Sequence, residues 1–105
     1  MTEISYVDYR GEHILECRGH AGQAALGADI LCSAISVLCL TAKEYLEGAL
    51  SRGDISELYC DLAPGSATIR FACNEESDAL KCMDALLCGF KMLGESFPQN
   101  IDLDI

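Results

Sequence analysis

The sequence predicts one α+β domain in which two helices pack on a mostly antiparallel sheet, with the element order ββαββαβ. Segments that alternate between apolar and polar residues come in pairs, and two long segments with helical spacing separate them. The chain has 105 residues, half of them hydrophobic, which is enough for one core but not for two. Residues 1–105 are therefore expected to form a single domain without an internal linker.

The first two strands are expected at residues 3–9 and 12–18, where apolar and polar residues alternate on either side of Arg10-Gly11. A short turn that contains Gly between two such runs is typical of a β-hairpin. The small-residue segment 19–28 follows and is expected to be a loop.

The first helix is expected from Asp29 to about Leu50, because apolar residues recur there every three or four positions. Asp29 is a favourable N-cap, since its carboxylate can accept a hydrogen bond from a backbone N–H of the first turn. Gly53 is a favourable residue just past the end of the helix.

A second hairpin is expected from the alternation at residues 58–62 and 69–73, with Pro64-Gly65 as its turn. A second helix should open near residues 74–76 and end near Gly94. The alternation at 101–105 predicts a final strand.

The composition favours an acidic cytoplasmic protein with free thiols. The net charge of −10 argues against nucleic-acid binding. Solubility is the simpler explanation of this charge, and attraction to a basic partner is the alternative. The seven cysteines are odd in number and irregularly spaced, which argues against a disulfide framework. No apolar run is long enough for a membrane span, and the acidic start does not resemble a signal peptide.

The candidate catalytic residues are concentrated between residues 19 and 36. His20 lies in the motif Gly19-His20-Ala21-Gly22, and Cys32 follows twelve positions later at the start of the expected helix. A thiolate nucleophile needs a base and a field that lowers its pKa. His20 could take the thiol proton, and a helix N-terminus favours the anion.

Two further residues could support this pair. With Asp29 as N-cap, its carboxylate would accept a hydrogen bond from the Cys32 N–H and fix the first turn. Ser36 lies one turn beyond Cys32 on the same side of the helix, although an ordinary surface serine explains it nearly as well.

Taken singly, these residues also have ordinary explanations: a cysteine on a helix is usually a small buried hydrophobe, and a lone histidine is usually solvated. His13 lies on a strand with no partner in the sequence pattern, and we assign it no role.

No Cys-x-x-Cys pair is present and there are only two histidines, so neither a zinc site nor another metal site is expected. We expect no cofactor. The remaining cysteines are expected in the core or on element faces: Cys17, Cys39, Cys60, Cys73, Cys82 and Cys88.

The motif Gly19-His20-Ala21-Gly22, followed by Gly27-x-Asp-Ile-Leu-Cys-x-Ala-x-Ser ending at Ser36, resembles the signature of the ribosomal-processing cysteine protease family. The resemblance extends over the whole chain in length and element order. It implies a cytoplasmic bacterial cysteine endopeptidase that removes the N-terminal extension of a large-subunit ribosomal protein, and it implies a homodimer.

By motif position, the resemblance implies that Cys32 is the nucleophile and His20 the base, with Asp29 and Ser36 as supporting residues. The substrate loop would comprise Gly19, Ala21, Gly22 and Gly27. Two other functions stay open from the residues alone. One is a non-catalytic ribosome-associated binding protein, and the other is a thiol redox sensor in which Cys32 is oxidised reversibly.

Overall fold

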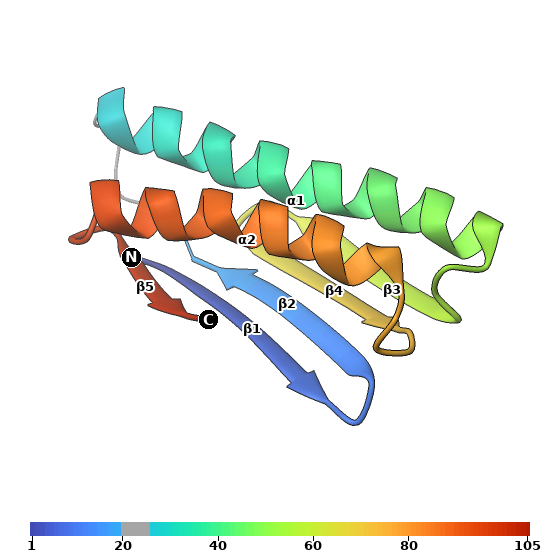
Figure 1. Cartoon of the computed structure of the whole chain (residues 1–105). Helices are drawn as coiled ribbons and strands as arrows, with labels where there is room; N and C mark the ends of the chain where they lie inside the picture. Colours follow the sequence, from blue (N-terminus) through green and yellow to red (C-terminus); the bar gives the residue numbers. More distant parts are fainter. Residues whose placement is uncertain (20–25) are drawn as a thin grey trace.

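A computed structural model shows a five-stranded sheet with both helices packed on one of its faces (Figure 1). It describes residues 1–19 and 26–105, with side chains for 1–19 and 30–105. The elements are β1 (Thr2–Tyr9), β2 (Glu12–Arg18), α1 (Leu26–Arg52), β3 (Glu57–Ala63), β4 (Ser66–Ala72), α2 (Asp78–Ser96) and β5 (Ile101–Asp104). The predicted order ββαββαβ and the α+β fold class are confirmed.

The strand order in the sheet is β3-β4-β2-β1-β5. All neighbouring pairs are antiparallel except β1 and β5, which run parallel. The helix α2 connects β4 to β5 as a crossover, so β5 runs in the same direction as β4 and therefore as β1. The hairpin turns follow the local chemistry. Arg10 and Gly11 both have positive φ, as the tight turn between β1 and β2 requires, and Gly65 has φ 75 beside Pro64.

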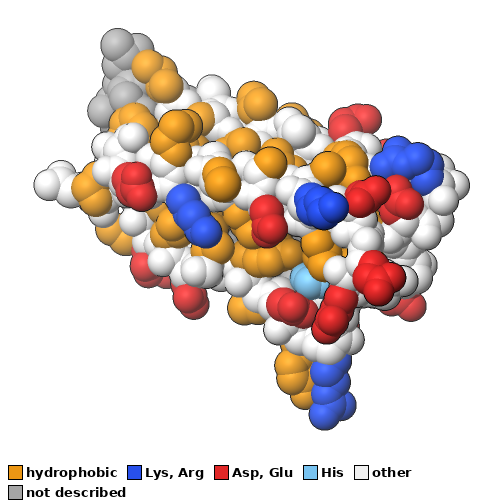
Figure 2. Space-filling view, viewed as in Figure 1, with side chains coloured by type: hydrophobic (Ala, Val, Ile, Leu, Met, Phe, Trp, Pro, Cys, Tyr) orange, Lys and Arg blue, Asp and Glu red, His pale blue; other side chains and the backbone are white. Residues whose placement is uncertain are grey.

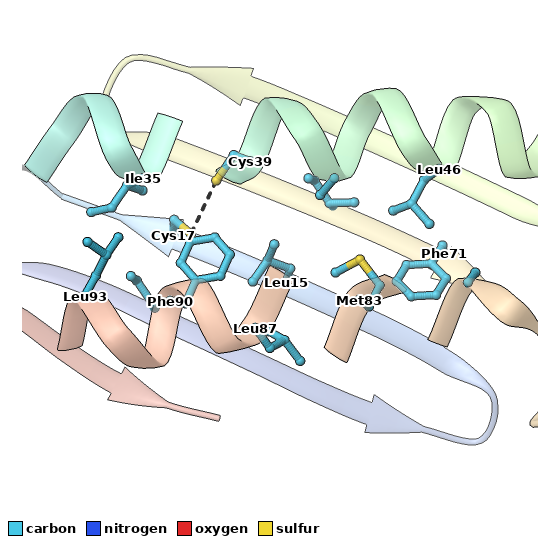
Figure 3. Close-up of a cluster of buried hydrophobic side chains, with 14 of the residues drawn as sticks. Leu15, Cys17, Ile35, Cys39, Leu46, Phe71, Met83, Leu87, Phe90 and Leu93 are labelled. Atoms are coloured by element: carbon cyan, nitrogen blue, oxygen red, sulfur yellow. Dashed lines mark hydrogen bonds between the residues drawn. The ribbon is translucent and has the colours of Figure 1, made fainter. Parts of the chain in front are cut away.

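The core lies between the helices and one face of the sheet. Alternate residues of the central strands point into it, among them Leu15 and Cys17 on β2 and Phe71 on β4. They meet buried residues of both helices, such as Leu46 on α1 and Phe90 on α2 (Figure 3). These contacts form a core between the two helices and the sheet.

The second helix begins later than expected. Asn74 accepts a hydrogen bond from the Glu76 N–H at 3.3 Å, which forms a turn ahead of the helix. The Ser77 hydroxyl then accepts from the Ala79 N–H at 3.2 Å and acts as the N-cap of α2. The helix ends at Ser96, two residues beyond the expected Gly94.

The first helix begins earlier than expected, at Leu26 rather than after Asp29. The predicted N-cap at Asp29 is therefore wrong, and so is the predicted loop at residues 26–28, which includes Gly27. Leu26 and Ala28 are strong helix formers, and one interior glycine costs only about 1 kcal/mol. The helix propensity of this segment therefore outweighs the signal of one good capping residue.

The other face of the sheet is open and acidic. The strand registers place seven carboxylates on it against two arginines, Arg18 and Arg70. Arg18 is paired with Glu16 at 2.6 Å, and Arg70 stacks over the Tyr59 ring. The carboxylates are those of Glu3, Glu12, Glu16, Glu57, Asp61, Asp102 and Asp104.

None of the helices in the described part of the chain is long and apolar enough to span a bilayer.

Candidate active site

A cavity lies at the end of the sheet where β2 leads into α1. Its volume is about 470 Å³, which is enough for a peptide side chain and some of its backbone. One wall is α1, the floor is formed by the adjacent ends of β1 and β2, and the opposite wall is the hairpin between β3 and β4, including Pro64 and Gly65.

Cys32 lines this cavity from the second turn of α1 and is partly buried. Ser36 lines it one turn further along the same side of the helix, and Cys39 lines it one turn beyond that. This i, i+4, i+7 arrangement follows from helical geometry. The cavity therefore receives two thiols from α1, one partly buried and one buried, and one hydroxyl.

The early start of α1 changes the electrostatic argument for Cys32. Cys32 is the seventh residue of the helix instead of lying in its first turn. The field of a helix N-terminus falls off within that first turn. The helix dipole therefore stabilises a thiolate at this position less than the sequence suggests. A partner side chain has to supply more of that stabilisation.

Gly19 brings the chain from β2 to the edge of the cavity. It has φ 96, and a Cβ atom there would lie 2.6 Å from the Met1 carbonyl oxygen. Its N–H donates to the Gly65 carbonyl at 2.8 Å. Only glycine fits this backbone position without a clash, so the residue before His20 is held at the cavity.

His20, Ala21 and Gly22 lie outside the described residues. The backbone of Gly27 and Asp29 belongs to the start of α1, and the side chain of Asp29 lies outside the described part. Of the predicted site residues, the structure thus brings Cys32, Ser36 and Gly19 to one cavity.

Thr2 supplies a buried hydroxyl that the sequence analysis missed. Its side chain lines the cavity and is 3% exposed. Among the described residues, its Oγ1 has no hydrogen-bond partner. A buried hydroxyl without a partner costs about 1–3 kcal/mol, so this oxygen favours any ligand that reaches it with a polar group.

Two buried thiols also lie against the cavity. The sulfur atoms of Cys17 and Cys39 are 3.7 Å apart (Figure 3). The hydrogen bond to Cys39, together with burial, raises the pKa of Cys17. The same contact lowers the pKa of Cys39, and the two thiols therefore titrate as a pair.

The other histidine lies in a different part of the molecule. His13 is buried, its ring stacks 4.9 Å from that of Phe71, and it shares a 3.1 Å hydrogen bond with the Tyr6 hydroxyl. Alternation could have revealed this burial, because His13 has the same parity as Leu15 and Cys17 on β2.

His13 is too far away to act on Cys32. It lies four residues along β2 from Cys17, which is roughly 13 Å, and it does not line the cavity. Among the described residues no cluster of three His, Cys, Asp or Glu side chains could hold a metal ion.

The geometry thus shows a partly buried cysteine in the lining of a cavity that is large enough for a peptide side chain. A protein-family profile described as cysteine protease Prp matches residues 1–102. The chain belongs to this family of cysteine peptidases.

Solved structures share the fold over nearly the full chain. One is described as an essential ribosomal processing protease Prp from S. aureus with a covalently linked product peptide, and it has a TM-score of 0.78 at 20% identity. It covers 99% of this chain and 98% of its own. The same protease with a substrate peptide gives 0.70 at 16% identity, with the same coverage.

A third similar structure is SMU.848 from Streptococcus mutans, with a TM-score of 0.67 and 22% identity. It covers all of this chain and 93% of its own. No curated protein sequence matches this chain.

Proposed function

We propose that this protein is a cysteine endopeptidase that removes the N-terminal extension of a large-subunit ribosomal protein. Cys32 is the nucleophile and His20 the general base. The observation that carries the proposal is the position of Cys32 in the lining of the 470 Å³ cavity. Membership of the Prp family supplies the reaction class.

In this mechanism His20 takes the proton of the Cys32 thiol, and the thiolate attacks the scissile carbonyl carbon. The proton then passes to the leaving amine, and water releases the acyl group from the sulfur. Elimination supports His20 as the base, since the only other histidine is held at the far end of β2. Asp29 and Ser36 support the pair, and the segment with Gly19, Ala21, Gly22 and Gly27 contacts the substrate.

The cavity binds a substrate side chain next to the scissile bond. Its walls are mainly apolar, with Ile35 and Leu40 on α1 and Leu62 on β3. The Thr2 hydroxyl at the floor is the polar group within reach of the tip of that side chain. A mainly apolar substrate side chain with a polar end could form a hydrogen bond with the Thr2 hydroxyl, either directly or through a water molecule.

The acidic sheet face explains how a basic substrate is attracted. Seven carboxylates face solvent there against two paired arginines. Such a field raises the rate at which a basic protein encounters the enzyme, and salt screens it. Ribosomal proteins are basic, so the charge of this face matches the proposed substrate class.

We place the homodimer contact on the outer side of α1. Residues 30–42 contain no charged side chain, and Ile30 and Val37 are both more than half exposed. Figure 2 shows hydrophobic side chains gathered over this helix. Two copies of the acidic sheet face would repel each other, whereas two copies of this uncharged surface would not.

The Val37→Glu variant is expected to shift the protein from dimer to monomer in analytical ultracentrifugation, and an unchanged mass would contradict this placement.

The cleavage test uses the purified protein and a ribosomal protein that carries its N-terminal extension, with the product read by intact mass. The wild type is expected to shorten the substrate, and Cys32→Ala to reduce the rate at least about 1,000-fold while keeping the fold. Cys88→Ala is the matched control, since Cys88 is an exposed thiol on α2 that does not line the cavity.

Two results would contradict the proposal. Substrate that stays bound at full mass would favour a non-catalytic ribosome-associated binding protein. Cleavage that survives in a well-folded Cys32→Ala variant would remove Cys32 from the mechanism.

A further inference from the structure

Two thiols from distant parts of the chain meet beneath the Cys32 cavity. Cys17 comes from β2 and Cys39 from α1, 22 positions later, and their sulfur atoms lie 3.7 Å apart (Figure 3). Each residue is only 4% exposed, yet both line the cavity. Small solutes that enter the cavity can therefore reach them, while larger thiol reagents are hindered.

We propose that Cys17 and Cys39 form a two-thiol oxidation site, which a small hydroperoxide converts into a disulfide between β2 and α1. This site is separate from the proposed peptidase chemistry and does not depend on it. Cys32 lies about two turns from Cys39 along α1, roughly 10 Å, and takes no part in the bond.

The reaction balances with the hydroperoxide as the oxidant. The sulfur of one thiolate attacks the terminal peroxide oxygen, the O–O bond breaks, and the alkoxide takes a proton to leave as an alcohol. The sulfenic acid that forms is then attacked by the second sulfur, and water leaves. The two thiols together lose two protons and two electrons, and the peroxide is reduced.

The surroundings of the pair favour this order of events. The hydrogen bond between the two thiols stabilises a thiolate on the sulfur that accepts it, so one member of the pair is the attacking sulfur. The other member then acts as the resolving thiol from within van der Waals distance. Burial excludes large competing thiols, so the sulfenic acid is captured by its neighbour.

The geometry requires only a local movement. The sulfur atoms must approach from 3.7 Å to about 2.05 Å. On the core face of the sheet, the neighbour of Cys17 on β4 is Ala67, whose small side chain leaves room for the Cys17 side chain to rotate. Among the described residues no other two sulfur atoms lie within hydrogen-bond distance.

The experiment uses the full-length Cys32→Ala variant, which removes the reactive thiol in the cavity lining and keeps the pair. The folded protein is treated with a small excess of hydrogen peroxide, and the remaining thiols are blocked under denaturing conditions. The intact mass is expected to show one disulfide and four blocked thiols. Trypsin is expected to yield residues 11–18 linked to residues 19–43, and in this variant Cys39 is the only cysteine of the second fragment.

The oxidised protein is also expected to melt roughly 15 °C higher than the reduced protein, because the bond closes a loop of 22 positions. A reductant should reverse both changes. Cys32→Ala/Cys39→Ser is the matched control and should form no disulfide and show no shift, whereas Cys32→Ala/Cys88→Ser should behave as the parent does.

The proposal is overturned if peroxide converts the other thiols of the folded protein to sulfenic or sulfinic acids while Cys17 and Cys39 stay reduced. It is also overturned if Cys17 pairs with several cysteines in the folded state. Peroxide treatment in urea provides the comparison for random pairing, since the unfolded chain is expected to give mixed linkages.

Discussion

The two ends of the sheet differ in whether their buried polar groups have hydrogen-bond partners. At the end near the β1–β2 turn, His13 lies between the Tyr6 and Phe71 rings and shares a hydrogen bond with the Tyr6 hydroxyl. At the other end, Thr2 and Cys32 line a cavity, and the Thr2 oxygen has no partner among the described residues. A buried histidine that is packed and paired stabilises the fold, whereas a cleft with an unpaired hydroxyl and a thiol is built to receive a ligand.

The largest expected effect separates the two histidines. His20→Ala is expected to lower kcat for cleavage of the extended ribosomal protein by roughly 10²–10⁴, because a general base contributes about that much. His13→Phe keeps an aromatic ring against Phe71 and is expected to leave kcat unchanged, although it leaves the Tyr6 hydroxyl unpaired. Equal losses of kcat in two folded variants would show that the distinction between the two ends is wrong.

The removal of one hydroxyl from each end is expected to change stability in opposite directions. Thr2→Val removes an unpaired buried oxygen and is expected to raise the free energy of unfolding by about 1 kcal/mol. Tyr6→Phe breaks the hydrogen bond to His13 and is expected to lower it by about 1 kcal/mol. Urea denaturation of the wild type and both variants measures these changes.

Thr2→Val is also expected to lower kcat/KM about fivefold, which corresponds to one lost hydrogen bond of about 1 kcal/mol to the substrate. Thr2→Ser restores the hydroxyl and should recover the activity. A Thr2→Val variant that is less stable than the wild type, or equally active, would show that the Thr2 hydroxyl has a partner in the free protein.

The fold could be predicted from the sequence because its signals are local and repeated. Alternation located the strands within three residues, and Arg10-Gly11 and Pro64-Gly65 marked the two hairpin turns. The N-terminus of α1 was placed wrongly because one capping signal, Asp29, was weighed above the helix propensity of the preceding residues.

The candidate site could be predicted only in part. Helical spacing placed Cys32 and Ser36 on one side of α1, and both line the cavity. Thr2 and the Cys17–Cys39 contact join residues far apart in the sequence, and no local pattern encodes such contacts. The side-chain role of Asp29 and the position of His20 stay predictions from motif position.

The smallest expected effect concerns alkaline pH at the paired end of the sheet. Burial, reinforced by Asp8 and other nearby acidic groups, raises the pKa of Tyr6 well above its usual value of 10.0. The folded state then keeps the phenol proton in a pH range where the unfolded chain releases it. The contribution of Tyr6 is fully present below pH 10, and the free energy of unfolding falls as the pH rises above that value.

Tyr6→Phe is therefore expected to lose stability more slowly than the wild type above pH 10. The difference in slope should be less than about 1.4 kcal/mol per pH unit, because Tyr6 keeps some contact with water. Tyr9→Phe is the matched control, since Tyr9 lies on the same strand and is mostly exposed, and its curve should follow that of the wild type. Urea titrations between pH 8 and pH 11 measure the three slopes. Parallel curves for Tyr6→Phe and the wild type would mean that the phenol ionises equally in the folded and unfolded states, and that the His13 end of the sheet is more open to water than its packing indicates.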